Sequence, residues 1–131
     1  MIDMNEKTVL CACSGMNPRG EVSRVSVFDL SVEHDDIEYC CIVASGGNFG
    51  KFIDLAKNHD VIAVNGCDNC CPESILKTKN ATVEYNLNVK ELLRKHGLKA
   101  ECTVRINEND EKCVSIIKNE ILKIKNELED S

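Results

Sequence analysis

The sequence predicts an α/β domain in which helices cover a mainly parallel sheet of four or five strands. Short apolar or β-branched runs alternate with segments of helical periodicity through most of the chain, which is typical of a three-layer sandwich. Several apolar runs end in a glycine turn, as strands do where they leave a sheet. A long amphipathic pattern at the end predicts a C-terminal helix. We therefore expect one domain over residues 1–131.

Three strands are predicted in the first half of the chain. The first covers residues 8–13 (TVLCAC) and stops at Ser14-Gly15. The second covers residues 37–44 (IEYCCIVA), before Ser45 and two glycines. The third covers residues 61–64 (VIAV), a short β-branched run that leads into Asn65-Gly66. A run of this kind indicates a buried strand at the centre of the sheet.

Helical segments separate these strands. Pro18 suits a first helical turn, and the apolar spacing that follows predicts a helix through Leu30. Asn48 is a predicted cap for a second helix, whose apolar face extends to Ala56. Pro72 opens a third helix, which we expect to end near Lys79.

The last third of the chain predicts a strand at residues 81–87, a helix at 89–96 closed by Gly97, and an edge strand at 101–106. The tail helix has the clearest pattern, because its apolar residues recur every three or four positions. These residues are Val114, Ile117, Ile121, Ile124 and Leu128. We expect this stripe to pack on the sheet of its own domain; the alternative is a coiled-coil seam, which would make a homodimer.

Composition argues against several classes of partner. The chain carries a formal charge of −6 and has a pI near 5.1, which disfavours nucleic acid and anionic membrane surfaces. The start of the sequence lacks the pattern of a signal peptide, and no uncharged apolar stretch approaches the ~18 residues of a membrane span. We expect a cytoplasmic protein.

Nine cysteines are the outstanding feature of the composition. In a cytoplasmic protein, such a number favours metal or redox chemistry over structural disulfides. Seven of the nine lie on or just after the three predicted strands of the first half. They are Cys11, Cys13, Cys40, Cys41, Cys67, Cys70 and Cys71. Parallel strands bring their carboxyl ends to one edge, so these thiols are expected to converge.

A four-thiolate zinc site is the main hypothesis. Zinc binds four ligands in a small tetrahedron, and cysteines separated by two or three residues commonly supply two of them. Cys67 with Cys70 or Cys71 fits that spacing, while Cys13 and Cys41 from neighbouring loops would complete the site. An iron–sulfur cluster fits the same ligand count. The two remaining thiols, Cys102 and Cys113, are expected to be small buried apolar side chains.

Two redox or catalytic alternatives use the same cysteines. Cys67 and Cys70 form a C-x-x-C motif, the spacing of disulfide exchange. Cys13 and Arg19 have five residues between them, as in the phosphate-binding loop of a low-molecular-weight phosphatase or arsenate reductase. Gly20 stands where such enzymes usually have Ser or Thr, however, and no Asp-Pro follows to supply a general acid. Catalysis is therefore not our main expectation.

The glycine-rich segment of residues 45–51 (SGGNFGK) resembles a phosphate-binding P-loop only in part. Ser45 replaces its first glycine, and Phe52 replaces the Ser or Thr that binds Mg²⁺. We interpret the segment as a tight strand-to-helix turn that passes close to the cysteines.

Together, these motifs resemble the DGC domain family, small prokaryotic proteins described as zinc-binding. Its Cys-Ser-Gly appears as Cys13-Ser14-Gly15, and its central cysteine with a glycine pair appears as Cys41 with Gly46-Gly47. The naming motif appears as Asn65-Gly66-Cys67, with Cys71 four positions on.

The resemblance implies four zinc ligands, with Cys70 as the alternative to one of them. The implied ligands are Cys13, Cys41, Cys67 and Cys71. The glycines that would let the loops close around the ion are Gly15, Gly46, Gly47 and Gly66. One departure stands out: Asn65 replaces the family's Asp, and its amide could hydrogen-bond a thiolate instead.

Overall fold

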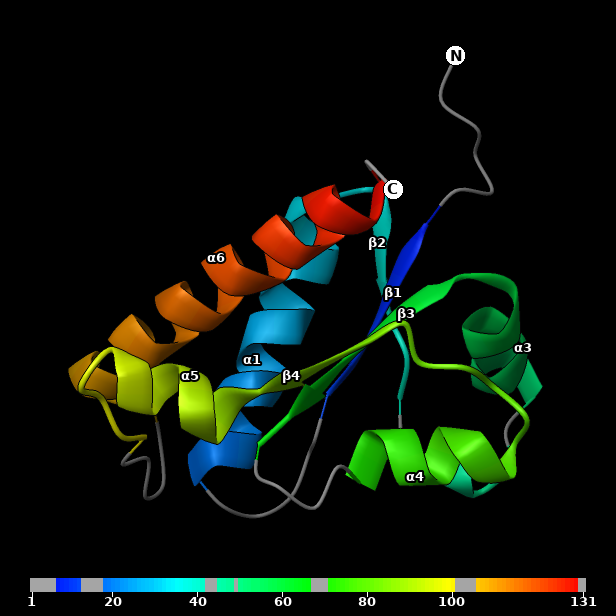
Figure 1. Ribbon diagram of the computed structural model, residues 1–131, viewed down its shortest axis with the longest axis horizontal. Coiled ribbons are helices and arrows are strands. Elements are labelled where there is room, and N and C mark those ends of the chain that lie inside the picture. Colours follow the sequence, from blue (N-terminus) through cyan, green and yellow to red (C-terminus); the bar gives the residue numbers. More distant parts are fainter. Residues whose placement is uncertain are drawn as a thin grey trace.

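A four-stranded parallel sheet forms the centre of the protein (Figure 1). The computed structural model describes residues 7–12, 18–41, 45–48, 50–66, 71–100 and 106–129. The strand order is β2-β1-β3-β4. The bounds are β1 Thr8–Ala12, β2 Ile37–Tyr39, β3 Asp60–Asn65 and β4 Tyr85–Asn88. Each neighbouring pair is parallel, with Thr8 of β1 opposite both Ile37 and Asp60.

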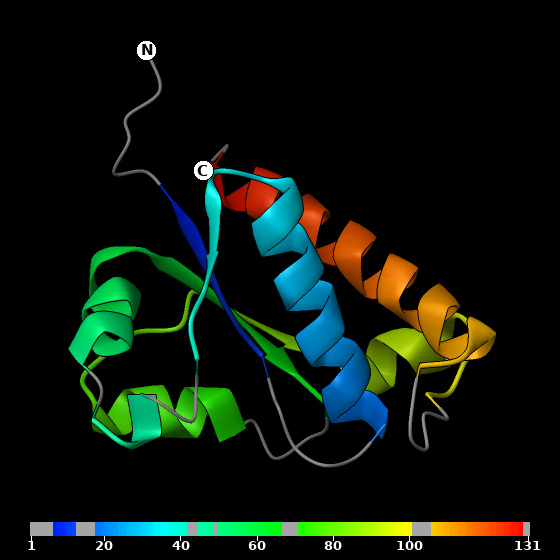
Figure 2. The same ribbon diagram turned by 180° about the vertical axis from the view of Figure 1, so that it is seen from behind.

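Helices cover both faces of this sheet, as Figures 1 and 2 show. The bounds are α1 Pro18–Glu33, α3 Gly50–Asn58, α4 Cys71–Thr78, α5 Val89–Lys95 and α6 Glu108–Glu129. Helices α1, α5 and α6 lie on one face, and α3 and α4 lie on the other. The predicted α/β sandwich with a long C-terminal helix is confirmed. Among the helices of the described ranges, none has the length and apolar character needed to cross a membrane.

Two cores result from the alternation of side chains along the strands. Leu10 and Ile62 point into the core beneath α1, α5 and α6. Val9, Cys11 and Val61 point into the smaller core beneath α3 and α4. The central strands β1 and β3 are therefore apolar on both faces, as expected of a buried parallel sheet.

Strand bounds differ from the predictions at two places. The second strand ends at Tyr39, while residues 42–44 of its predicted span lie outside the described residues. The fourth strand begins at Tyr85 instead of residue 81. Asn80 has a left-handed backbone (φ 61°), and Ala81 N–H donates back to Leu76 O (3.0 Å). This α4 cap occupies the residues that were expected to open the strand.

The predicted edge strand at residues 101–106 lies almost wholly outside the described residues, and Ile106 is not in a strand.

The C-terminal helix begins with a reciprocal cap. Asp110 N–H donates to Asn107 Oδ1 (2.9 Å), and Asn107 N–H donates to Asp110 Oδ2 (3.3 Å). Two N–H groups at the start of the helix are thereby satisfied, which fixes where the helix begins. Its apolar stripe, including Ile117 and Ile121 at 0% exposure, is buried in the core with α1 and the sheet. The expected packing of this stripe on its own domain is confirmed.

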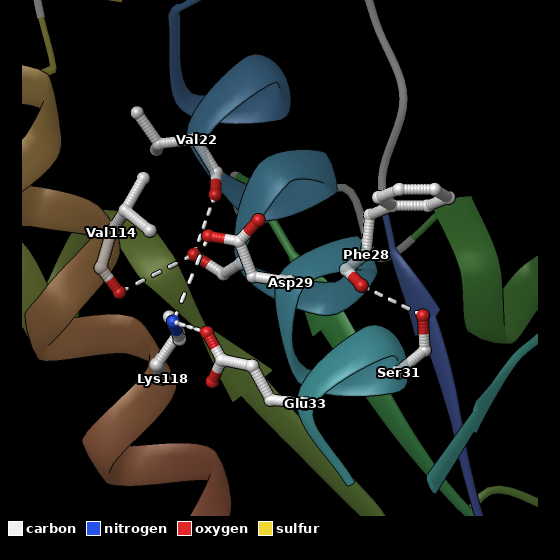
Figure 3. Close-up of polar contacts among 8 residues, drawn as sticks. Val22, Phe28, Asp29, Ser31, Glu33, Val114 and Lys118 are labelled. Carbon is white, nitrogen blue, oxygen red and sulfur yellow. Dashed lines mark hydrogen bonds and ion pairs between the residues drawn. The ribbon is translucent and has the colours of Figure 1, made fainter. Parts of the chain in front are cut away.

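Polar contacts fasten α6 to α1 (Figure 3). The buried Ser26 hydroxyl donates to Val22 O (2.6 Å) within α1 and lies 3.5 Å from Val114 O of α6. Lys118 Nζ lies 2.5 Å from a carboxylate oxygen of Glu33 and 3.7 Å from one of Asp29. The small, buried Ser26 side chain lets α1 and α6 pack closely, and the ion pairs of Lys118 connect the two helices at their surface.

A second ion pair, between Lys125 of α6 and Asp36 before β2, should make stability depend on pH. Lys125 is 8% exposed and lies 2.7 Å from an Asp36 oxygen. Its hydrogen bond lowers the pKa of Asp36 below the ordinary 3.8. The Asp36 contribution is therefore complete above 3.8 and is lost as pH falls through the lower, folded-state value. Burial opposes the charge of Lys125, but hydrogen bonds to Asp36 and Glu129 raise its pKa overall.

We expect Lys125→Met to lower the free energy of unfolding at neutral pH by about 1 kcal/mol or less, since Asp36 is 45% exposed. The loss should shrink as Asp36 becomes protonated. Urea unfolding of both proteins from neutral to acidic pH measures this difference. The exposed Lys123→Met on the same helix is the control. Identical pH curves for the two variants would contradict a stabilising pair.

Candidate functional site

The carboxyl ends of β1 and β3 form a topological switch point. These strands are neighbours, yet the chain leaves β1 for α1 on one face of the sheet and leaves β3 for α4 on the other (Figures 1 and 2). Parallel α/β sheets bind ligands in the crevice that such a divergence opens. The third strand end, that of β2, lies at the same edge. This edge is the candidate site.

Gly66, the residue after β3, brings the strand end against the first turn of α1. A Cβ built at Gly66 would lie 3.2 Å from the backbone nitrogen of Gly20 and 3.3 Å from the carbonyl carbon of Arg19. These distances are tighter than ordinary contacts, and the neighbouring atoms belong to a helix backbone that cannot easily move. A Cβ here would force these backbone atoms to shift by a few tenths of an ångström, so glycine favours the close approach of β3 to α1 at this edge.

Cys11 and Cys40 form a buried thiol pair. Leu10 of β1 is opposite Tyr39 of β2, and Cys40 N–H donates to Leu10 O (2.8 Å), which places the next residues of the two strands side by side. The exposures of Cys11 and Cys40 are 0% and 3%. Cys40 Sγ also lies 3.4 Å from the hydroxyl oxygen of the buried Ser45. Each thiol therefore has polar partners inside the protein.

The two thiols of this pair have opposite pKa shifts. The hydrogen bond to Cys40 raises the pKa of Cys11 well above its ordinary value, and burial adds to the rise. The same hydrogen bond lowers the pKa of Cys40 to about 7 despite burial, with help from Ser45. Cys11 therefore keeps its proton while Cys40 is the first of the two to ionise.

Asn65, the last residue of β3, begins a chain of side-chain hydrogen bonds. Its Nδ2 donates to Asn86 Oδ1 of β4 (3.1 Å), and Asn86 Nδ2 donates to a carboxylate oxygen of Glu73 in the first turn of α4. Asn65 is 2% exposed. Its Oδ1 is buried and has no hydrogen-bond partner within the described part of the chain. An acceptor oxygen is therefore left open at the switch point.

Cys41 lines a cavity of about 230 Å³ between α1 and the carboxyl ends of β1 and β2. Its walls include Phe28 of α1 and Tyr39 of β2, whose ring centroids are 6.0 Å apart. Figure 3 shows the Phe28 ring on the side of α1 away from α6. Arg24 also lines the cavity. Cys41 is only partly buried, whereas Cys11 is buried.

A comparison with protein-family models decides the family. The model described as the DGC domain matches residues 9–116. This chain belongs to the DGC domain family. Comparisons with curated proteins and with solved structures found no match. The matched span begins at the second residue of β1 and ends within α6, so it includes all four strand ends and the switch point.

The predicted ligands of this DGC domain are described only in part. Cys13, Cys67 and Cys70 lie outside the described residues, and Cys71 is described only as the first residue of α4. Cys41 is the one predicted ligand with a described side chain. Within the described ranges, no cluster of three or more His, Cys, Asp or Glu side chains could hold a metal ion. The four-thiolate set stays a prediction.

Other predicted residues have clear positions. Arg19 lies in the first turn of α1, beside Gly66. Gly46 is exposed, and an added Cβ would lie 3.7 Å from a methyl carbon of Ile75, an ordinary contact. Gly47 is exposed as well, while Gly15 lies outside the described residues. Of Gly46 and Gly66, only Gly66 has surroundings in which an added Cβ would make contacts tighter than ordinary ones.

Sequence reasoning missed the partners of Asn65. One of the two N–H groups of its Nδ2 donates to Asn86. The expected hydrogen bond from this amide to a thiolate stays a prediction, because Cys13, Cys67 and Cys70 lie outside the described residues. Asn86 and Glu73 lie in ordinary polar positions of the sequence, so no local pattern marked them. The Cys11–Cys40 pair was missed as well, because it follows from the register of β1 and β2, which the local sequence pattern does not reveal.

Proposed function

We propose that this DGC domain binds zinc through cysteine thiolates at the carboxyl edge of its sheet. The proposed ligands are Cys13, Cys41, Cys67 and Cys71, with Cys70 as the alternative. The observation that carries the proposal is the in-register parallel arrangement of β1, β2 and β3. It brings the ends of three strands to one edge, and each proposed ligand is within six residues of one of those ends.

Helix geometry supports thiolates in this region. Cys71 is the first residue of α4, and the N-terminus of a helix favours a negative charge such as a thiolate. The first turn of α1 lies beside Gly66, at the start of the segment that contains Cys67. Zinc would act there as a centre that holds deprotonated thiols together.

We propose that the bound zinc is exchangeable, as in a metal carrier. What supports this role is the partial exposure of Cys41, which would let an incoming thiol reach a ligand. Cys11 and Cys40 are too buried to serve as exchange ligands without opening of the domain. A redox or sulfur-transfer accessory role would instead use reversible oxidation of the same thiols.

Metal analysis of anaerobically purified protein tests the proposal. We expect about one zinc ion per chain and a colourless protein, with Co²⁺ substitution producing the absorption of a thiolate site. Cys41→Ser should lower zinc affinity at least about tenfold, because one thiolate is replaced by a weaker ligand. Cys113→Ala, which removes a buried thiol of α6, should leave the affinity unchanged.

Other results would favour the alternatives. A brown protein that contains iron and acid-labile sulfide would replace zinc by an iron–sulfur cluster. If neither metal is present, and Cys13→Ser abolishes arsenate reduction or aryl-phosphate hydrolysis, the protein is an enzyme that uses Cys13 and Arg19. Stoichiometric zinc that exchanges with a chelator only after unfolding would indicate a structural site instead of a carrier.

A further inference from the structure

The hydrogen-bond chain from Glu73 through Asn86 to Asn65 has a fixed direction. An ionised carboxylate can only accept hydrogen bonds, so Asn86 must present its NH₂ group to Glu73. The carbonyl oxygen of Asn86 then faces Asn65, which must present its own NH₂ group. The inner end of the chain is consequently an oxygen. Glu73 therefore orients the amide of Asn65 through Asn86, without contacting Asn65 itself.

That inner oxygen is the feature of the chain that needs an explanation. Asn65 Oδ1 is buried and accepts no hydrogen bond within the described ranges. Buried polar atoms are nearly always satisfied, and each exception calls for an explanation, such as a functional role or a bound water or ion. The open oxygen belongs to the last residue of β3, at the switch point and two positions before Cys67. Its position is the reason to connect it with the cysteine edge.

We propose that Glu73 and Asn86 are positioning residues that hold Asn65 with its oxygen inward, where it accepts a hydrogen bond that forms when the cysteine edge binds zinc. This inference rests on the proposed zinc site. The donor is an N–H or O–H group ordered in the loaded state. An acceptor oriented in advance favours that state over the empty one, as partners beyond the direct ligands commonly do in metal sites.

Reversing the chain tests its direction. Asn65→Asp alone places an acceptor opposite the Asn86 oxygen, and a flip of Asn86 would only move the clash to Glu73. Asn65→Asp with Glu73→Gln can be satisfied in the opposite sense: the introduced glutamine amide donates to Asn86, which in turn donates to the introduced carboxylate. We expect Asn65→Asp to lower the melting temperature of the metal-free protein by about 4 °C or more. The double variant should recover most of that loss.

Zinc affinity, measured by competition with a chelator, separates positioning from stability. Glu73→Gln alone lets the chain adopt either direction, so with both directions equally populated we expect zinc affinity to fall about twofold, with little change in melting temperature. The double variant keeps an acceptor at the inner end and should bind zinc at least as well as Glu73→Gln does. Glu84→Gln, an equal charge change at an exposed residue next to β4, should have no effect on zinc affinity.

Two results would overturn the inference. If the effects of Asn65→Asp and Glu73→Gln on the melting temperature simply add, the chain has no fixed direction. If wild-type protein binds zinc but all the variants bind it equally well, the Asn65 oxygen does not serve the site. A wild-type protein that binds no zinc rejects the proposed function itself, and in that case the melting temperatures still report whether the chain has a direction.

Discussion

Leu30→Ala should lower the free energy of unfolding by about 2–5 kcal/mol, a reduction of about 10–20 °C in melting temperature. Leu30 is 0% exposed and lies in the core that α1 shares with α6 and the sheet. Truncation removes buried apolar surface and leaves a cavity between α1, α6 and the sheet, which these packed elements cannot fully close. Stability of most domains is about 5–15 kcal/mol, so the variant should still fold. Urea unfolding followed by circular dichroism measures the loss.

Val32→Ala provides the matched comparison on the same helix. Val32 is 70% exposed, so its truncation removes little buried surface. Alanine is also the better helix former, and we expect a change within about 0.5 kcal/mol in either direction. If the two variants lose similar stability, α1 does not pack on the sheet in the way described.

The architecture was predictable because local patterns decide it. Residues 61–64 are a continuous apolar run rich in β-branched side chains, as expected of a strand buried on both faces, and they form the centre of β3. The tail stripe repeats every three or four residues, and α6 buries it. The predicted start of the fourth strand was wrong because hydrogen bonds at the end of α4 override the strand propensity of the residues that follow. Residues 81–83 have strand-like alternation, but the cap around Asn80 holds them out of the sheet.

The sequence predicts which edge of the sheet holds the candidate site. It does not predict the hydrogen bonds between side chains at that edge. Strand ends that carry cysteines indicate a common edge as soon as the sheet is parallel. Spacing along the chain cannot reveal that the thiols of Cys11 and Cys40 share a hydrogen bond. Nor can it reveal that Asn86 links Asn65 to Glu73. Those relations depend on which strands are neighbours, and the order β2-β1-β3-β4 is a property of the folded chain.

Gly66→Ala should lower the free energy of unfolding by about 1–3 kcal/mol and weaken zinc binding as well. The added Cβ would meet the backbone of Arg19 and Gly20 at 3.2–3.3 Å, and relief requires β3 and the first turn of α1 to move apart. That movement would displace the start of the segment that contains Cys67, so the proposed ligands would no longer be held at their spacing. Thermal unfolding of the metal-free protein and chelator competition measure the two effects separately.

Gly50→Ala is the control that isolates the contact at Gly66 from the general effect of removing a glycine. A Cβ at Gly50 would meet nothing within 4 Å, and the residue is the exposed first position of α3. Because alanine lowers the entropy of the unfolded chain, we expect this variant to be neutral or stabilised by up to about 1 kcal/mol, with unchanged zinc affinity. Equal stability of the two variants would show that β3 and α1 tolerate separation. Loss of zinc binding in Gly66→Ala at unchanged stability would instead show that the contact sets the ligand geometry alone, since a fold that is intact can still hold its thiols too far apart to share one ion.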